Sequence, residues 1–462
     1  MRILRPLALL LAGGLLLHGG ADEVQAEAES VTWLRAYLRA DTTNPPGHEE
    51  RGIAVLADVL RREGVPFRLL TSPTGRVNLM ARLESGRAEA RDLVLLHHVD
   101  VVAAGEGWTV PPFGGTLQGE RVYGRGAIDS KGLGIAQLAA FVALHRSRIP
   151  LRRNVVFLAV AEEETGGIQG AGFLLEAYPE LFARVEAVLN EGGSNRAVGE
   201  KMFWWGIETT QKRALWLEVT ARAQGGHGAS LRPRSATHEL IQALARVTQL
   251  PLRYRLSPPV RQALLSQAPH HNPSNRRILE AIDRWIDADG VLRSQVPPGT
   301  IGLLVDTIQV TVLDAGQQVN VIPAEARAQV DIRLLPDTDR EQFMAQIDAA
   351  LGPTVAYRIL LDSPEAPASP IDGSFFGELR RLLESDPRSA APVTQWVSSG
   401  VTDSRYFRQR GVAAYGFSPF GLDGESTKGI HASDESIALA VFEGGVATYR
   451  RVLSALAGPV GQ

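Results

Sequence analysis

The stretch Leu93-Val94-Leu95-Leu96-His97-His98-Val99-Asp100 decides the fold, because an apolar run ends in side chains that can bind a metal. A short apolar run of this kind is typical of a strand buried on both faces of a parallel sheet. Two later stretches repeat the arrangement: residues 155–160 lead into Glu162-Glu163-Glu164, and residues 187–189 lead into Asn190-Glu191. Ligands of open α/β sheets bind beyond the carboxyl ends of the strands, so we expect these side chains to converge on one crevice.

Two further candidate ligands lie outside these strands. Asp129 lies in the glycine-rich segment 123–132, ahead of a helix predicted over 132–146, and His431 lies in segment 429–435. Asp129 could be the N-cap of that helix. However, a carboxylate has two oxygens and can bridge two cations about 3.5–4 Å apart, and the glycines around Asp129 favour that role. The full set of candidates predicts a two-metal hydrolase site: His98, Asp100, Asp129, Glu163, Glu164, Glu191 and His431.

The acidic run Glu162–Glu164 is unusual after a buried strand, because three adjacent carboxylates repel one another unless cations neutralise them. We expect one of them to bind metal and a neighbour to act as the general base that deprotonates water. The alternative is a solvated acidic loop. Asp100 is expected to accept the second ring N–H of His98 and so fix its orientation, with a capped strand end as the alternative. His97 would point to the opposite face of the strand, in a structural role.

Composition bounds the class of protein. The chain has 462 residues, of which 44% are hydrophobic and 21% charged, which predicts a globular protein of at least two domains. The net charge of -3 gives no sign of the basic surface that proteins use to bind nucleic acid. There is no cysteine, so any metal must be bound by oxygen and imidazole ligands, and there are no disulfides.

The N-terminus has the pattern of a secretory signal. Basic residues occur within segment 1–5, segment 7–17 is almost purely apolar, and Val24-Gln25-Ala26 supplies small residues for cleavage. We therefore expect a signal peptide over residues 1–26 and a secreted or periplasmic mature chain that is not in a membrane after cleavage. A retained membrane anchor is the alternative, but the apolar segment is short for a span.

The pattern along the chain predicts two interleaved domains. Helices and strands alternate to about residue 205, and the same kind of pattern returns after a Pro-rich linker at 363–370. The intervening elements follow a β-α-β-β-α-β order, with strands at 215–220, 308–312, 326–334 and 355–361 and helices at 236–250 and 340–351. The fold class is therefore α/β, with a mostly parallel catalytic domain over 27–210 and 363–462 and an α+β domain over 211–362. An insertion at about 251–302 has no readable shape.

Taken together, these segments resemble the M20 metallopeptidase family, which includes carboxypeptidase S, aminoacylase-1, glutamate carboxypeptidase and succinyl-diaminopimelate desuccinylase. The resemblance runs in order from about Trp33 to His431. Its motifs are His98-Val99-Asp100-Val101-Val102, the segment 124–132, Glu162-Glu163-Glu164, Asn190-Glu191-Gly192, Gly225-Gly226-His227, Asn320-Val321-Ile322-Pro323, Asp331-Ile332-Arg333, Thr402-Asp403-Ser404-Arg405 and His431. Departures at His97, Ala103 and Glu162 remove no ligand. The insertion and the Asn190-Glu191-Gly192-Gly193 form look more like the carboxypeptidase S and aminoacylase branches.

The resemblance implies a zinc-exopeptidase-like catalytic domain with an inserted ferredoxin-like domain that serves as lid and dimerisation module. One Zn²⁺, replaceable by Co²⁺ or Mn²⁺, would be held by His98, Asp129 and Glu191, and a second by Asp129, Glu164 and His431. Glu163 would be the general base. His227 would reach the neighbouring subunit's site and stabilise the oxyanion, while Asn320 and Arg333 would bind the substrate's free carboxylate. A turn His, a turn Asn and a strand-edge Arg are the structural alternatives for the last three residues.

The function we expect is a dizinc metallohydrolase that cleaves an amide or peptide bond next to a free carboxylate, as a carboxypeptidase-type exopeptidase. An N-acyl-amino-acid deacylase and a dipeptidase are the enzymatic alternatives, so the substrate is a small peptide or an N-acyl amino acid. The alternative outside catalysis is a peptide- or metal-binding protein on the same fold. We also expect a homodimer formed through the lid.

Overall fold

The computed structural model describes residues 19–198, 201–297, 299–387, 389–422 and 424–459. The basic and apolar parts of the expected signal peptide lie outside these residues. Its cleavage motif, Val24–Ala26, falls within helix α1 (Gly19–Arg39). Among the helices that the structure describes, none combines the length and the apolar character that crossing a bilayer requires.

The larger domain, which is the one expected to be catalytic, is built on one large sheet, with strand order β1-β2-β6-β3-β7-β17-β9-β16 and β8 paired to β9. Its strands are β1 (Phe67–Thr71), β2 (Val77–Leu83), β3 (Asp92–His98), β6 (Asn154–Val160), β7 (Val185–Asn190), β8 (Arg196–Val198), β9 (Lys201–Gln211), β16 (Val393–Ser398) and β17 (Ala413–Gly416). The four central strands, β6, β3, β7 and β17, are parallel, whereas β1, β2 and β9 pair with their inner neighbours in antiparallel fashion. The predicted α/β class and its buried parallel strands are confirmed.

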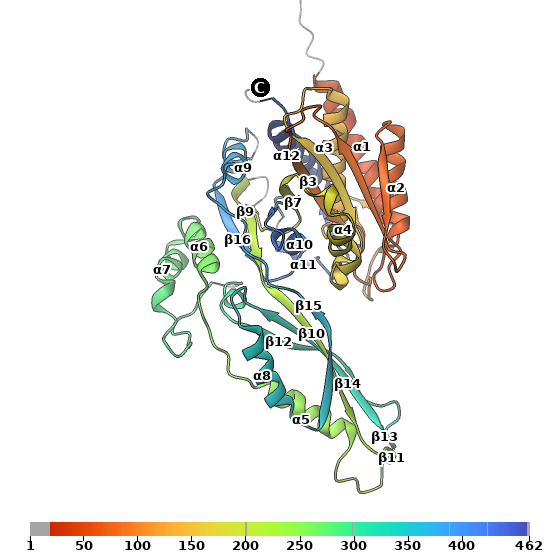
Figure 1. Cartoon of the computed structure of the whole chain (residues 1–462), viewed down its shortest axis with the longest axis vertical. Coiled ribbons are helices and arrows are strands. Elements are labelled where there is room, and N and C mark those ends of the chain that lie inside the picture. Colours follow the sequence, from red (N-terminus) through yellow and green to blue (C-terminus); the bar gives the residue numbers. More distant parts are fainter. Residues whose placement is uncertain (1–18, 199–200, 298, 388, 423, 460–462) are drawn as a thin grey trace, which may run out of the picture.

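Helices cover both faces of this sheet (Figure 1). They are α1, α2 (Glu49–Arg62), α3 (Lys131–Ser147), α4 (Phe173–Ala177), α9 (Ser374–Glu384), α10 (Ser404–Arg408), α11 (Gly424–Lys428) and α12 (Leu439–Ala457). Leu93 and Leu95 of β3 pack into the core with α3 and α12, whereas Val94 and Leu96 pack into a second core with α4 and α10. Successive residues of a strand face opposite sides, which is why the opening stretch is apolar without interruption.

Two small sheets lie apart from the main sheet in the strand topology. One contains β4 (Thr116–Gln118), β5 (Arg121–Tyr123) and β18 (Ser436–Ala438), with β5 in the middle. The other pairs β11 (Gly226–His227) with β13 (Val321–Ile322). The first places the segment after His431 beside the segment before Asp129.

The lid is a four-stranded antiparallel sheet with the order β12-β14-β10-β15. Its elements are β10 (Arg213–Arg222), α5 (Ala236–Thr248), β12 (Thr307–Asp314), β14 (Glu325–Leu334), α8 (Arg340–Leu351) and β15 (Val355–Asp362). All six elements match the predicted β-α-β-β-α-β order, and both helices contribute to the core against the sheet. In Figure 1 the lid projects from the main sheet, with β11 and β13 at its far tip.

The helices of the insertion at 251–302 pack on the main sheet, whereas Arg255 near its start contacts Thr338 and Asp337 of the lid. Its helices are α6 (Pro258–Gln267) and α7 (Pro273–Glu280). Val260 and Leu264 share a buried cluster with Val397 of β16, and Gln267 Nε2 donates to the Gln395 carbonyl at 2.8 Å. The interval 211–362, expected to be one domain, therefore contains two parts, because the insertion covers the edge strand β16.

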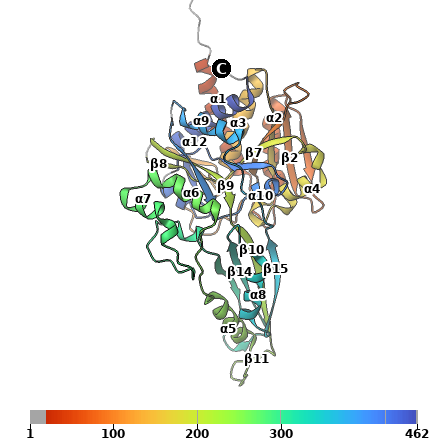
Figure 2. The ribbon, with the colours of Figure 1, turned by 60° about the vertical axis from the view of Figure 1, so that its left-hand side comes forward.

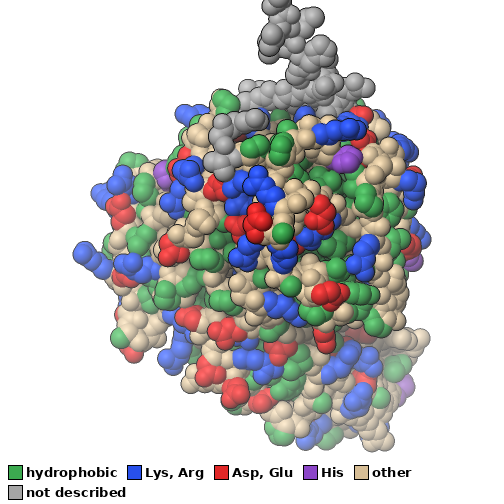
Figure 3. Space-filling model, turned by 45° about the horizontal axis from the view of Figure 1, so that its top comes forward, with side chains coloured by type: hydrophobic (Ala, Val, Ile, Leu, Met, Phe, Trp, Pro, Cys, Tyr) green, Lys and Arg blue, Asp and Glu red, His purple; other side chains and the backbone are tan. Residues whose placement is uncertain are grey.

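Charged side chains of both signs are interspersed over the face shown in Figure 3. Proteins that bind nucleic acid usually gather their basic side chains into one patch or stripe. On the part of this face that the structure describes, neither sign of charge gathers in that way.

Candidate active site

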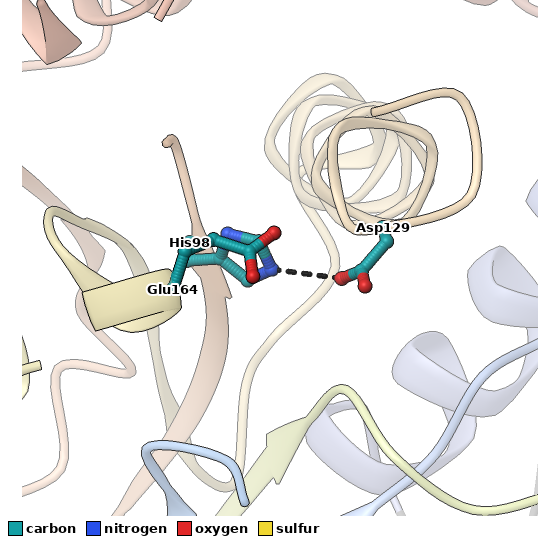
Figure 4. A group of neighbouring side chains, drawn as sticks. All are labelled: His98, Asp129 and Glu164. Carbon is teal, nitrogen blue, oxygen red and sulfur yellow. Dashed lines mark hydrogen bonds and ion pairs between the residues drawn. The ribbon is translucent and has the colours of Figure 1, made fainter. Parts of the chain in front are cut away.

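The carboxyl ends of β3, β6 and β7 bring the predicted ligands together. His98 is the last residue of β3, Glu163 and Glu164 lie in the turn after β6, and Glu191 follows β7. The His98 Nε2 atom lies 3.3 Å from Glu191 Oε2 and 3.0 Å from Asp129 Oδ1. Figure 4 shows His98 and Glu164 facing Asp129, which comes from the loop before α3. The convergence that the three strand ends predict is present in the structure.

Asp129 contacts both imidazoles through different oxygens. Its Oδ1 is 3.0 Å from His98 Nε2, and its Oδ2 is 3.1 Å from His431 Nε2. His431 Nε2 is also 3.4 Å from Glu164 Oε2. The ligand atoms of two triplets each lie within 4.8 Å of one another: His98, Asp129 and Glu164, and His98, Glu163 and Glu191. His98 belongs to both triplets, and Asp129 lies between the imidazoles of His98 and His431.

These side chains fit a pair of divalent cations. Imidazole nitrogens and carboxylate oxygens are the ligands that zinc takes in sites without cysteine. The Oε1 atoms of Glu163 and Glu164 are buried and have no hydrogen-bond partner among the described residues. Buried carboxylate oxygens without a donor are costly unless a cation approaches them. The residues present therefore match the donor set that a two-metal centre requires.

The electrostatics of the cluster point the same way. Burial, followed by the charge of Glu191, raises the pKa of Glu163 well above its usual range, and burial with the Asp129 charge raises the pKa of Glu164 to about 7. Burial opposes ionisation of Asp129, but hydrogen bonds from His431 and His98 hold its pKa well below its usual range. The carboxylates thus outnumber the positive charges close to them, and cations among them would favour their ionised forms.

Asp100 holds the ligands in place, but not in the manner that the sequence predicted. The His98 Nδ1 atom lies 2.8 Å from the backbone carbonyl of Asp100 and 3.6 Å from its carboxylate. The carboxylate instead accepts the backbone N–H groups of Glu163 and Glu164, both at 3.1 Å, and the Asn44 amide at 2.8 Å. The carbonyl still orients the ring, with Nε2 toward the cluster. The expectation that the Asp100 side chain accepts the His98 N–H is therefore wrong in detail.

Glu435 plays the matching role beneath Asp129, and sequence reasoning missed it. Its carboxylate is fully buried and accepts the N–H groups of Ile128 at 2.8 Å and Asp129 at 3.2 Å. The Arg125 guanidinium also donates to it, at 2.9 Å. The only sequence signal is that Glu435 follows His431 by four residues, which carries no indication that the segment returns to the Asp129 loop.

A second support lies behind the Glu163 turn, in the motif that begins at Thr402. The Arg405 guanidinium and the Tyr406 hydroxyl both donate to the Gly166 carbonyl, at 2.5 and 2.6 Å. Both carboxylate oxygens of Asp403 are buried without a hydrogen-bond partner in the described structure, and burial raises the pKa of Asp403 to about 7. These contacts fix the loop that carries the expected general base.

The ligands face a cleft of about 460 Å³ between the main sheet and the lid. Trp216, Arg333 and Leu361 line it from the lid. The Arg333 guanidinium donates to Asp331 at 2.7 and 3.0 Å and lies 5.7 Å from the Trp216 ring centre. Arg333 therefore reaches the cleft, as expected of a residue that binds a substrate carboxylate.

His227 and Asn320 lie elsewhere, at the tip of the lid (Figure 1). His227 pairs with Val321 in the β11–β13 ladder, and the Asn320 carbonyl accepts the Gly228 N–H at 2.7 Å. Both side chains are exposed. Within one chain, the structure does not bring either residue to the metal ligands, and it separates Asn320 from Arg333.

Comparison with known proteins places the chain in a family. The sequence model of peptidase family M20/M25/M40 matches residues 94–455. Aminoacylase-1 of Sus scrofa is 27% identical over 448 residues, which covers 94% of this chain and 96% of that protein. The N-fatty-acyl-amino acid synthase/hydrolase PM20D1 of Homo sapiens is 29% identical over 363 residues, covering 76% of this chain and 71% of that protein.

A solved structure agrees with the fold. The M20 family metallo-carboxypeptidase Sso-CP2 from Sulfolobus solfataricus superimposes with a TM-score of 0.72 at 18% identity, covering 92% of this chain and 98% of that one. The resemblance stated from the sequence motifs is confirmed, and the alternative of a protein that only binds is set aside. The chain belongs to peptidase family M20/M25/M40 and is a hydrolytic enzyme.

Proposed function

We propose that this chain hydrolyses the amide bond of N-acyl amino acids, using two divalent cations. The observation that carries the proposal is the position of Asp129, whose two oxygens contact two different imidazoles. His98, Asp129 and Glu191 would hold one cation, and Asp129, Glu164 and His431 the other. Zinc suits these ligands, and cobalt or manganese could replace it. When bound, the cations would polarise the scissile carbonyl and acidify the attacking water.

The remaining chemistry belongs to side chains of this protein. Glu163 lies within the cluster with an oxygen that has no hydrogen-bond partner, so it is placed to accept a proton from water and pass it to the leaving amine. Arg333 would hold the substrate carboxylate on the lid side of the cleft, because a guanidinium pairs well with a carboxylate. Asp331 accepts only some of the N–H groups of the Arg333 guanidinium, so others are left for the substrate.

We further propose that the site is completed by a second copy of the chain. His227 and Asn320 are exposed at the lid tip, remote from the cluster of their own chain. In a dimer formed through the lids, each tip would reach the cleft of the other copy, where His227 would stabilise the oxyanion.

The pattern of residues 1–26 supports export to a secreted or periplasmic location.

Hydrolysis of peptides next to a free carboxylate, by a carboxypeptidase or a dipeptidase, is the second candidate. Arg333 in the cleft serves either substrate, because both carry the same carboxylate beside the scissile bond. The match to aminoacylase-1 over nearly the full length of both chains favours the deacylase.

The test is a substrate panel with controlled metal content. The purified chain is stripped with a chelator and then assayed with zinc, cobalt or manganese against N-acetyl amino acids and against dipeptides. We expect no turnover without metal and faster hydrolysis of the N-acetyl compounds than of dipeptides with it. Faster hydrolysis of dipeptides would favour the second candidate, and no hydrolysis of either class with any of the metals would contradict both.

A further inference from the structure

A second cavity, of about 440 Å³, adjoins the metal-facing cleft. Leu422 lines both spaces. Gly193 lines the cleft and the next residue, Ser194, lines the second cavity. On β16, Ser398 lines the cleft while Trp396 lines the second cavity, and two residues of a strand span only about 7 Å. The two cavities are therefore neighbours that share a wall.

The chemistry of this second cavity differs from that of the cleft. The cleft contains four carboxylates, whereas none lines the second cavity among the residues described. Its charged or titratable groups are Arg196, which lies over the Trp204 ring at 5.2 Å, and His271. Large apolar side chains make up part of its lining: Trp204, Leu264, Leu279, Leu303, Trp396 and Leu422. Uncharged polar side chains make up another part: Ser194, Asn195, Gln267, Thr300 and Thr427. Cavities of roughly 300–1,000 Å³ that combine apolar side chains with a few polar ones usually bind small molecules.

The walls are held in position without a ligand. Residues of α6 and α7 in the insertion line one side of the cavity, and residues of β8 and β9 line another. Figure 2 shows α6 and α7 beside β8 and β9. Gln267 on α6 donates to the Gln395 carbonyl at 2.8 Å. Asn195 donates to the carbonyls of Ser418, at 2.7 Å, and Phe420, at 2.9 Å. Because these hydrogen bonds hold the walls, the cavity is preformed, and binding does not have to include the entropy cost of ordering the walls.

We propose that this cavity binds the apolar acyl chain of the substrate, which makes the insertion at 251–302 the element that selects the acyl group. The inference rests on the proposed function. Arg333 would hold the carboxylate on the lid side, and the acyl chain begins on the other side of the scissile bond. No residue of the lid sheet lines the second cavity among those described, whereas Leu422 and the Gly193–Ser194 backbone connect it to the metal ligands. An unbranched apolar chain suits the part of the wall formed by Trp204, Trp396 and the leucines.

The first experiment measures kcat/KM for N-acyl derivatives of one amino acid, from acetyl to dodecanoyl. Each buried methylene should raise kcat/KM about fourfold until the cavity is full. A flat or falling profile in the wild-type enzyme would overturn the proposal. If acetyl derivatives and dipeptides both fail to react, the proposed function is at fault instead, and the binding measurement below decides the subsite.

A pair of matched variants tests whether the acyl chain of the substrate lies in the second cavity. Ala197→Trp adds an indole to the cavity wall, and Leu69→Trp adds the same group on an exposed strand that lines neither cavity among the residues described. We expect Ala197→Trp to lower the ratio of dodecanoyl to acetyl kcat/KM by at least ~10-fold, and Leu69→Trp to keep the wild-type ratio. Trp396→Ala, which widens the cavity, should move the preferred chain toward greater length. If neither cavity variant changed the ratio of dodecanoyl to acetyl kcat/KM, the acyl chain would have to bind elsewhere, which would overturn the proposal.

A binding measurement is independent of catalysis. Decanoate is titrated into the metal-free protein while tryptophan fluorescence is recorded, since Trp204 and Trp396 line the cavity. We expect a saturable change in the wild type and in Leu69→Trp that is weakened in Ala197→Trp. No saturable change in the wild type, or equal affinity in all three proteins, would overturn the subsite even if the enzyme proves to be a deacylase.

Discussion

The end of the main sheet and the tip of the lid carry the two halves of the expected site, and they are built differently. At the sheet, Asp100 and Glu435 are fully buried and hold the ligand loops through backbone N–H groups. At the tip, His227 and Asn320 are exposed on two short strands and the loops beside them. One chain therefore preorganises the candidate metal ligands, whereas His227 could act on a substrate only if a second copy brought its cleft to the lid tip, as proposed above.

The largest expected effect is a loss of turnover from a change at the end of the main sheet. Glu163→Gln should reduce kcat by about 10²–10⁴-fold, because general-base catalysis contributes that much. Metal content, measured by atomic emission after gel filtration, should stay at the wild-type value. Glu162→Gln is the matched control, since its side chain accepts the Gln169 N–H outside the cluster. Equal turnover in the two variants would remove Glu163 from the role of base.

Ion pairs show the same contrast between the two regions. Glu208 and Arg408 form a fully buried pair with two contacts of 2.8 Å under the main sheet. Arg408→Met should lower the free energy of unfolding by about 3–5 kcal/mol, because it leaves Glu208 buried without its partner. The exposed lid pair Arg358–Glu218 serves as control, and Arg358→Met should change little. Urea unfolding of both variants measures the difference, and equal stabilities would contradict it.

The support beneath the ligands should matter next. Asp100→Asn replaces one acceptor oxygen with a donor that faces the N–H groups of Glu163 and Glu164. We expect the metal affinity to fall about 10–100-fold, as for other groups that orient metal ligands. Competition with a chromogenic chelator measures it. Asp41→Asn, which alters a half-buried carboxylate whose contacts are to Thr43, is the comparison. A loss of the same size there would show that the effect is not specific to Asp100.

The smallest expected change is a partial recovery of activity, and it tests the role of His227 at the lid tip. Glu163→Gln and His227→Ala chains are each expected to be nearly inactive, and mixing them under conditions that exchange subunits should restore activity. In a symmetric dimer that shares its sites, equal mixing should restore about a quarter of the wild-type value, because half of the dimers carry one intact site. No recovery after confirmed exchange would place the action of His227 within its own chain or outside catalysis.

Much of the fold and the metal ligands could be predicted because the signals are local. The apolar runs that became β3 and β6 are buried along their whole length, and a strand that ends in a ligand delivers that ligand to the sheet edge. The lid elements were equally readable, since β14 alternates buried and partly exposed residues along its length.

The rest depends on contacts between distant segments. Glu435 lies over three hundred positions from the Ile128 N–H that it accepts, and no local pattern marks such a pairing. The insertion shows no periodicity that indicates its partner, because its apolar residues pack against Val397 of a strand much later in the chain. The Asp100 carboxylate was assigned to His98 because the two residues are neighbours in sequence, whereas the turn after β6 occupies it.

The central claim is that Asp129 is shared by two cations, and a crystal structure of the zinc-loaded chain tests it most directly. We expect two anomalous peaks about 3.5–4 Å apart, each within bonding distance of one Asp129 oxygen, with His98 on one ion and His431 on the other. A single peak, or two peaks of which only one contacts Asp129, would contradict the account.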